Sequence, residues 1–150
     1  MKPGRLWLSV APIAVALACF LVSEDEVARE TSPSGDIDAV LTETNGGATT
    51  SFGYLVYLVP HGASASHDSG RVALVDGGTR NDQAWGVNLK WLSPDQLAVE
   101  YLSARYADLP ESSVHIIGRD ISIQLIGGVN DPQAPPGGML YNLGGRSHDR

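Results

Sequence analysis

An uninterrupted apolar run near the start, LWLSVAPIAVALACFLV at residues 6–22, contains no charged side chain. Lys2 and Arg5 precede this run, and the acidic residues 24–26 follow it. Positive charge before an apolar segment and negative charge after it are typical of a secretory signal, or of a membrane anchor that leaves the rest of the chain outside the cytoplasm. Residues 1–22 are therefore predicted to be a signal peptide or membrane anchor, and to be the part of the chain that contacts a membrane.

Three fates are compatible with this segment. Cleavage after Ala18 fits the preference of signal peptidases for small residues, because Ala16 is also small. Lipidation at Cys19 would make the chain a lipoprotein, although residues 16–19 (ALAC) are a degenerate form of the lipidation motif, which usually begins with leucine. Retention as an uncleaved anchor is favoured by residues 20–22, which continue the apolar run past the cleavage position.

After the apolar run the pattern of polar and apolar positions changes twice. Residues 23–35 are polar and charged and end in the turn-forming sequence Ser-Pro-Ser-Gly, so they are predicted to be a tether. The period then becomes two, with Ile37, Ala39 and Leu41 on one face and mostly polar side chains on the other. This alternation predicts a half-buried strand at the start of a β domain that spans residues 36–126.

The rest of the β domain consists of short apolar segments divided by turn-forming residues. Residues 52–59 (FGYLVYLV) are apolar on both faces, which indicates a central strand that ends at Pro60. Two further stretches alternate on either side of a polar turn and predict hairpins. The predicted hairpins cover residues 85–101, with the turn at 93–96, and residues 114–126, with the turn at 118–120; a short strand is predicted at 72–75 and one helical turn at 104–107.

Together these segments predict a mainly β protein with one small antiparallel sheet or sandwich of about six or seven strands. An N-terminal hydrophobic helix precedes the sheet in this prediction, and residues 127–150, which are rich in glycine and proline, form a flexible tail. The 17 glycines and 9 prolines of the chain favour short strands and many turns over long helices.

The net charge limits the classes of partner, and the cysteine content limits the covalent chemistry of the predicted β domain. The chain has a net charge of −7, and because Lys2 and Arg5 belong to an N-terminal part without acidic residues, the remainder carries −9. Such a surface repels nucleic-acid phosphates, so no nucleic acid is expected as a partner, whereas a protein partner is permitted. The one cysteine, Cys19, lies in the apolar run, so the predicted β domain has neither a disulfide nor a cysteine nucleophile.

Three stretches carry a distinctive series of turn and strand residues: Ser-Pro-Ser-Gly at 32–35, Gly-Ala-Thr-Thr-Ser-Phe at 47–52 and Trp-Leu-Ser-Pro-Asp-Gln-Leu at 91–97. Their layout resembles a group of small, uncharacterised bacterial exported proteins that share a domain of unknown function. The resemblance covers residues 32–126 in patches and implies a β fold and export, without an activity. Members of that group often have a cysteine where this chain has Gly46, so the resemblance implies no disulfide at that position.

The loop after the predicted central strand is the strongest candidate for metal binding. His61, His67 and Asp68 supply two imidazoles and a carboxylate, which are ligands that Zn²⁺ accepts, and the intervening glycine and serines allow the loop to fold around an ion. The spacing matches no standard zinc motif, and ordering such a loop costs conformational entropy. Metal binding at these residues is therefore a hypothesis beside the simpler interpretation of a solvated loop.

Other catalytic or phosphate-binding chemistry has weaker support. A hydrolase triad assembled from Ser64 or Ser66 with His115 and Asp120 lacks the Gly-x-Ser-x-Gly elbow that normally presents the nucleophile. Residues 46–50 (GGATT) lack the Gly-Lys-Ser/Thr ending of a phosphate-binding loop and a helix after it. Neither pattern predicts an active site.

Two clusters remain as hypotheses about the surface. Asp36, Asp38 and Glu43 are close enough in sequence to approach a cation such as Ca²⁺, but a solvated acidic face is the simpler interpretation because the standard loop spacing is missing. Tyr57 and Trp85 would form a platform for a peptide or glycan if both were exposed, whereas core packing is the default for the aromatic residues.

The sequence thus predicts an uncharacterised cell-envelope protein that acts as a non-catalytic accessory or binding module, with no cofactor. It would lie in the periplasm or on the extracytoplasmic face of the membrane. One alternative is an envelope hydrolase or metal-dependent enzyme that uses the loop at residues 61–68. The other is an acidic inhibitor or immunity-type protein whose acidic face meets a basic enzyme.

Overall fold

A computed structural model describes residues 23–45, 52–66, 70–78 and 86–131 of the chain. The predicted signal or anchor segment with its Cys19 lies outside these residues, as does most of the predicted tail. Within the described part, no helix has the length and apolar character needed to cross a membrane.

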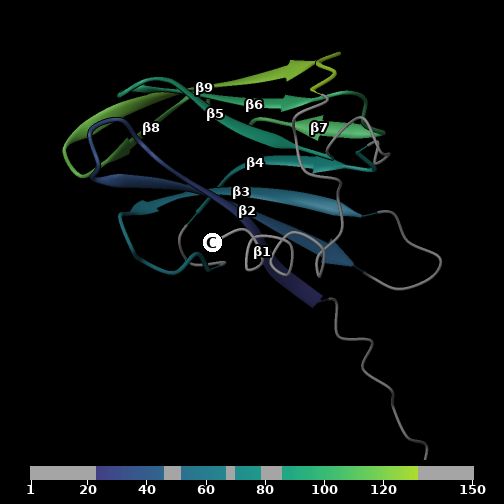
Figure 1. The fold of residues 1–150 in the computed structure, drawn as a ribbon, viewed down its shortest axis with the longest axis horizontal. Coiled ribbons are helices and arrows are strands. Elements are labelled where there is room, and N and C mark those ends of the chain that lie inside the picture. The colour runs from purple at the N-terminus through teal and green to yellow at the C-terminus, as the bar shows by residue number, and fades with distance from the viewer. Residues whose placement is uncertain (1–22, 46–51, 67–69, 79–85, 132–150) are drawn as a thin grey trace, which may run out of the picture.

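The predicted mainly β fold is confirmed, with more strands than the sequence indicated (Figure 1). The described residues form nine strands in two stacked sheets, one with the order β1-β2-β3-β4-β7 and the other with the order β5-β6-β9-β8. The strands are β1 (Ser23–Thr31), β2 (Ile37–Asn45), β3 (Gly53–Pro60), β4 (Arg71–Asp76), β5 (Asn88–Ser93), β6 (Gln96–Tyr101), β7 (Tyr106–Asp108), β8 (Ser113–Ile116) and β9 (Arg119–Gly127).

The core lies between the two sheets because alternate side chains of each strand point inward. From β2 the inward residues are Ile37, Ala39 and Leu41, as the period-two pattern predicts, and all three are fully buried. The opposite sheet contributes aliphatic side chains from β6 and β9, among them Leu97 and Ile121. Burial of this continuous apolar surface is the main force that holds the two sheets together.

Three predictions about individual elements are confirmed. β3 is buried on both faces and lies between β2 and β4 as a central strand. β5 and β6 form the first predicted hairpin, with Ser93 paired to Gln96 across the turn. β8 and β9 form the second, but its two-residue turn is at Ile117 and Gly118 and not at the predicted residues 118–120. Both turn residues have positive φ, 49° and 71°, as the tight type I′ turn requires.

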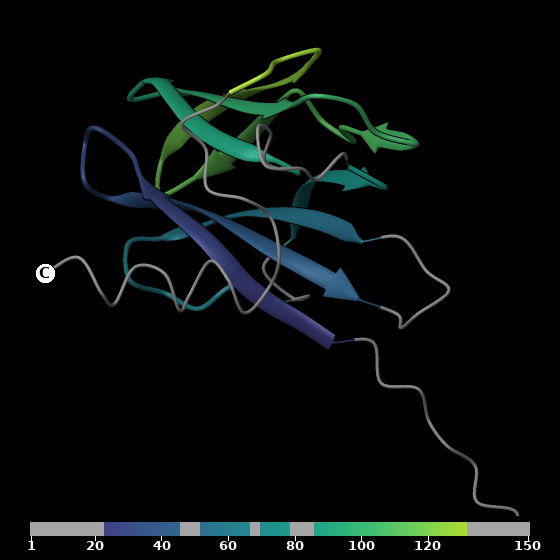
Figure 2. The same ribbon diagram turned by 45° about the vertical axis from the view of Figure 1, so that its right-hand side comes forward.

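The prediction of a tether after the apolar run is wrong in its first part, because Ser23–Thr31 is strand β1 and pairs antiparallel with β2. A bulge between Glu26 and Ala28 places the extra residue, Val27, in the core with 1% of its surface exposed. Figure 2 shows β1 (purple) along the outer edge of its sheet. Charged side chains are common on such edge strands, where they oppose pairing with other chains. The acidic composition of residues 23–31 is therefore compatible with a strand, although it suggested a tether.

β2 is also buried on the face that the sequence predicts to be solvated. Asp38 and Val40 are fully buried, and Thr42 is 6% exposed. The cause is the loop after β3, whose Ala63 and Ala65 pack against the outer face of the sheet. The prediction of a half-buried strand was therefore wrong, because the period of one strand does not reveal which other segment covers it.

Two further differences concern strand pairing. β6 and β9 are parallel, so their sheet is mixed and not purely antiparallel. Residues 104–107, predicted as one helical turn, lead into the short strand β7, whose Tyr106 pairs with Asp76 of β4. In both cases the partner strand is distant in the sequence, and local periodicity carries no information about it.

Candidate functional site

The outer face of the five-stranded sheet carries a buried ion network centred on Asp38. Its Oδ1 lies 2.9 Å from His61 Nδ1, and its Oδ2 accepts hydrogen bonds from Arg29 Nη1 at 2.8 Å and from the Gly62 main-chain N–H at 2.9 Å. The side chain of Asp38 is fully buried, whereas that of His61 is 59% exposed. The network joins β1, β2 and the loop that begins at His61.

These contacts hold the pKa of Asp38 well below its ordinary value. Burial by itself raises the pKa of a carboxyl group because it disfavours the charged form, but the hydrogen bonds from His61, the Gly62 N–H and Arg29 outweigh it. Asp38 is therefore ionised in the folded protein, and its charge is balanced by the guanidinium beside it.

Arg29 extends the network from the buried carboxylate toward solvent. Its Nε and Nη2 donate to the two carboxylate oxygens of Glu26, each at 2.8 Å, and its Nη1 also donates to the Ala63 carbonyl oxygen at 3.1 Å. Guanidinium groups form strong hydrogen bonds of this forked kind with carboxylates. Arg29 thus ties β1 to the loop that covers the outer face of the sheet.

The network bears directly on the predicted metal ligands His61, His67 and Asp68. The contact between Nδ1 of His61 and Asp38 leaves the Nε2 edge of the ring directed away from the carboxylate, and metal-ligating histidines commonly have such a carboxylate partner. His67 and Asp68 lie outside the described residues. Within the described ranges, no three His, Cys, Asp or Glu side chains are grouped so as to hold an ion.

A second polar cluster lies beside the network and lines a cavity of about 250 Å³ together with Ala65 and Ser66. Glu24 Oε1 accepts hydrogen bonds from the Thr42 hydroxyl at 2.8 Å and from the Tyr57 hydroxyl at 3.0 Å. Burial raises the pKa of Tyr57, and the hydrogen bond to Glu24 adds a smaller effect in the same direction, so that the pKa is about 12. Because this carboxylate is already hydrogen-bonded within the chain, the cavity gives little support to an acidic inhibitor surface.

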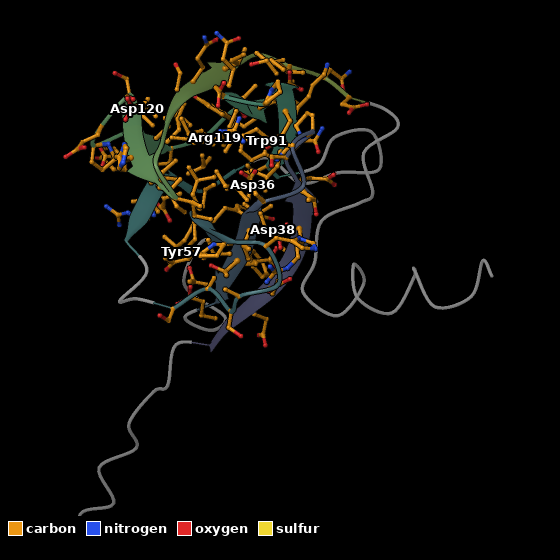
Figure 3. All side chains as sticks on the ribbon, turned by 90° about the vertical axis from the view of Figure 1, so that its left-hand side faces the viewer. Asp36, Asp38, Tyr57, Trp91, Arg119 and Asp120 are labelled. Carbon is orange, nitrogen blue, oxygen red and sulfur yellow. The ribbon has the colours of Figure 1, made fainter. Side chains whose placement is uncertain are left out.

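Arg119 connects three turns at one end of the sandwich, and Figure 3 shows it beside Asp36. Its guanidinium donates to both carboxylate oxygens of Asp36, at 3.0 and 3.1 Å, and to Asp95 at 2.9 Å. Further bonds reach the Pro94 carbonyl oxygen at 3.1 Å and the Ser34 hydroxyl. One side chain thereby holds the β1–β2, β5–β6 and β8–β9 turns together.

The three acidic residues proposed from sequence as a cation site do not converge. Asp36 binds Arg119, and Asp38 belongs to the buried network on the outer face. Glu43 is fully buried and alternates with Leu41, so it points toward the inner face of the same sheet. The solvated acidic face that was the simpler interpretation is also wrong for Asp38 and Glu43, because both are buried.

The structure also does not bring together the residues of the hypothetical hydrolase triad or of the aromatic platform. His115 Nδ1 lies 2.7 Å from Asp120 Oδ1, but both side chains are exposed on the β8–β9 hairpin. Ser66 lines the acidic cavity on the outer face of the other sheet, so it does not complete a triad with them. Tyr57 is buried, which removes it from any exposed aromatic platform. Trp85 and the glycine-threonine stretch before β3 lie outside the described residues.

A groove of about 300 Å³ opens between the two sheets, where β4 and β8 face each other. Its floor is aliphatic, with Leu58 and Val72 from one sheet and Val114 and Ile116 from the other. Concave apolar surfaces with a few polar groups at the rim are typical of binding sites, and this volume is at the lower end of their usual range.

Three polar residues, Arg71, Glu111 and His115, also line the groove, together with Gly70 and Pro110. Arg71 Nη2 lies 3.6 Å from Asp108 Oδ2, and the His115 ring contacts Asp120. Glu111 is exposed and forms no ion pair with any other residue that the structure describes. The groove therefore combines an apolar floor with one carboxylate, that of Glu111, which no cation among the described residues compensates.

The sequence pattern predicts neither the groove nor the Asp38 network. Arg29 was assigned to a tether, and the floor residues Leu58 and Val114 were assigned to core strands, which they partly are. One signal was available: Asp38 lies among apolar residues of a strand, and a buried carboxylate requires a partner. The identity of that partner, nine residues earlier on β1, depends on the hairpin register.

Comparisons with family models, with curated proteins and with solved structures each give no match. The fold and the groove define the chain as a two-sheet β sandwich with an inter-sheet groove. Its function is therefore inferred from its own residues and geometry.

Proposed function

We propose that this protein is an exported, non-catalytic module of the cell envelope that binds a partner in the groove between its two sheets. The groove is the observation behind this proposal, because its aliphatic floor is open to solvent and its rim holds the exposed carboxylate of Glu111, which has no ion-pair partner in the part of the chain that the structure describes. The apolar run at residues 6–22, with its flanking charges, supports export to the periplasm or to the extracytoplasmic face of the membrane.

The distribution of titratable groups supports binding over catalysis. Asp38, Arg29 and Glu26 neutralise one another while they fix a loop, and Arg119 neutralises acidic groups while it joins turns. Their charges contribute to holding the sandwich together. The resemblance of residues 32–126 to small bacterial exported proteins supports the same location.

Chemical modification of two cysteine variants tests whether the groove is occupied in the cell envelope. Pro110 is exposed and lines the groove, whereas Gln124 is exposed on β9 and does not line it. A partner in the groove would slow the reaction of Pro110→Cys with a maleimide in cells, relative to the purified full-length chain, by at least several-fold. Gln124→Cys would react equally in both settings. Equal behaviour of the two variants would contradict binding at this site.

We propose as a second candidate a metal-dependent role for the loop that begins at His61. The observation that favours it is the 2.9 Å contact with Asp38, which orients the ring and leaves Nε2 available. In calorimetric titration of the full-length chain with Zn²⁺, His61→Ala would abolish binding and His115→Ala, at another exposed histidine, would preserve it. Identical titrations of the two variants would reject this role.

A further inference from the structure

The walls of the groove are strand edges. Consecutive residues of a strand point to opposite faces of its sheet, yet Val114, His115 and Ile116 all line the groove. This occurs where a groove follows the main chain along the side of a strand. β8 is the last strand of its sheet and has β9 as its one neighbour among the described strands, so its other side is the side that borders the groove.

The opposite wall is also incompletely paired. β7 pairs with β4 at Leu74, Val75 and Asp76. Before these residues, Arg71 and Ala73 pair with β3 on one side, with Val72 in a bulge between them, and residues 71–73 pair with no strand of the described part on the other side. Among the described residues, the groove thus lies between two strand edges, one from each sheet, whose main-chain groups have no neighbouring strand.

The register of the β8–β9 hairpin specifies which main-chain groups face the groove. A two-residue turn is closed by a hydrogen-bonded pair, which here is Ile116 with Arg119. In antiparallel strands such pairs alternate with pairs that do not exchange hydrogen bonds, and His115 with Asp120 is the next pair. The N–H and C=O of His115 therefore point away from β9, toward the open edge.

We propose that the groove binds an extended peptide with alternating apolar and basic side chains, which adds as a strand to the edge of β8. The inference rests on the proposed function and names the occupant of that site. Strand addition uses main-chain hydrogen bonds for affinity and pockets for alternate side chains for specificity. Apolar side chains of the peptide would contact Leu58 and Val72, and basic ones would complement Glu111 and the net charge of −9 that follows the apolar run.

A pair of peptides tests the main-chain contribution directly. The probe is a capped peptide in which valines alternate with lysines, titrated against the full-length chain in a nonionic detergent. Its counterpart has methyl groups on alternate main-chain nitrogens, which removes hydrogen-bond donors and preserves every side chain. Strand addition predicts binding of the first peptide and a loss of roughly tenfold or more for the second, because more than one hydrogen bond is removed.

Two variants of one residue provide the matched test on the protein. His115→Pro and His115→Ala both lose the contact with Asp120, but only proline removes the main-chain N–H. The edge position of β8 tolerates proline, and thermal unfolding checks that both variants are folded. The proposal predicts roughly tenfold weaker binding by His115→Pro than by His115→Ala. It also predicts that Glu111→Gln weakens binding of the lysine peptide and reduces its salt dependence.

The outcomes separate this inference from the proposed function. Equal binding of both peptides, with equal affinities of the two His115 variants, would overturn strand addition while the groove stays a binding site. If neither peptide shifts the amide signals of residues 71–73 and 113–116, and if Pro110→Cys, like Gln124→Cys, reacts with maleimide equally in cells and in the purified chain, both the inference and the proposed function are overturned. Binding seen only in a chain shortened after Asp131 would assign the edge to the C-terminal segment and would overturn a separate peptide partner.

Discussion

Ile117 has a backbone conformation that its own side chain opposes. Its φ is 49°, in the left-handed region, where β-branched residues are genuine outliers. The side chain is 51% exposed, so core packing offsets little of this cost. The turn type favours asparagine followed by glycine, and Gly118 already occupies the second position.

Replacing Ile117 by asparagine is expected to stabilise the protein by about 1 kcal/mol, which corresponds to a rise of a few degrees in Tm. Asparagine tolerates positive φ because its short side chain can hydrogen-bond locally. The measurement is thermal unfolding of the full-length chain in detergent, and Ile117→Val is the control because valine retains the β-branch. A Tm for Ile117→Asn at or below that of Ile117→Val would show that strain at the turn is not the cause.

Asp38 contributes to stability through its charge. Asp38→Asn removes the charge that Arg29 neutralises and weakens the anchor of the covering loop, so we expect a loss of about 3 kcal/mol at neutral pH. The folded-state pKa lies below the unfolded value, so this contribution is present above the unfolded pKa of about 3.9 and falls as the pH drops toward the folded pKa.

Urea unfolding of the wild type and of Asp38→Asn across a pH series measures this dependence. The difference in the free energy of unfolding should be constant near neutrality and should shrink progressively below about pH 5. Asp120→Asn is the comparison, since Asp120 is 77% exposed and contacts an exposed histidine. A difference that stays unchanged to about pH 2, or a comparable cost in Asp120→Asn, would refute the structural role of the buried charge.

At the scale of elements, hairpins are what the sequence predicts best. Both hairpins join neighbouring segments, and the polar turn at residues 93–96 sets the end of the first hairpin locally, whereas the turn of the second begins one residue earlier than predicted. β1 was not predicted, because its bulge at Val27 breaks the period of two and because the acidic residues of this edge strand resemble a polar linker. The parallel pairing of β6 with β9 escaped detection because two other strands intervene in the chain.

Arg119 is the residue through which separate elements support one another. Arg119→Gln should lower Tm more than Arg105→Gln. Arg119, beside the β8–β9 turn, contacts two carboxylates and two further groups from two other turns, whereas Arg105 pairs with Asp76. Its side chain is also less exposed, at 23% against 67%, so solvent screens it less. Thermal unfolding at low and high salt provides the comparison. Equal losses in the two variants would mean that Arg119 does not connect the turns energetically.

At the scale of the whole molecule, the groove and the buried network arise from the association of sheets. Their residues belong to β1, β2, β3, β4, β8 and the connecting loops. A sequence pattern defines which face of each strand is apolar, but the groove depends on where two sheet edges stop pairing. The candidate site therefore exists only once the two sheets have associated. What the sequence alone predicts of it is the alternation of polar and apolar residues in the hairpins.

We propose that residues 1–22 direct this sandwich out of the cytosol, and labelling of Gln124→Cys in intact cells tests this export. Gln124 is exposed, and the wild type corrects for Cys19, the natural cysteine. A maleimide that cannot cross the cytoplasmic membrane should label the full-length variant in intact cells as completely as after lysis. The same variant without residues 1–22 should be labelled only after lysis. Labelling of the full-length variant that also requires lysis would place the sandwich in the cytosol and contradict the account.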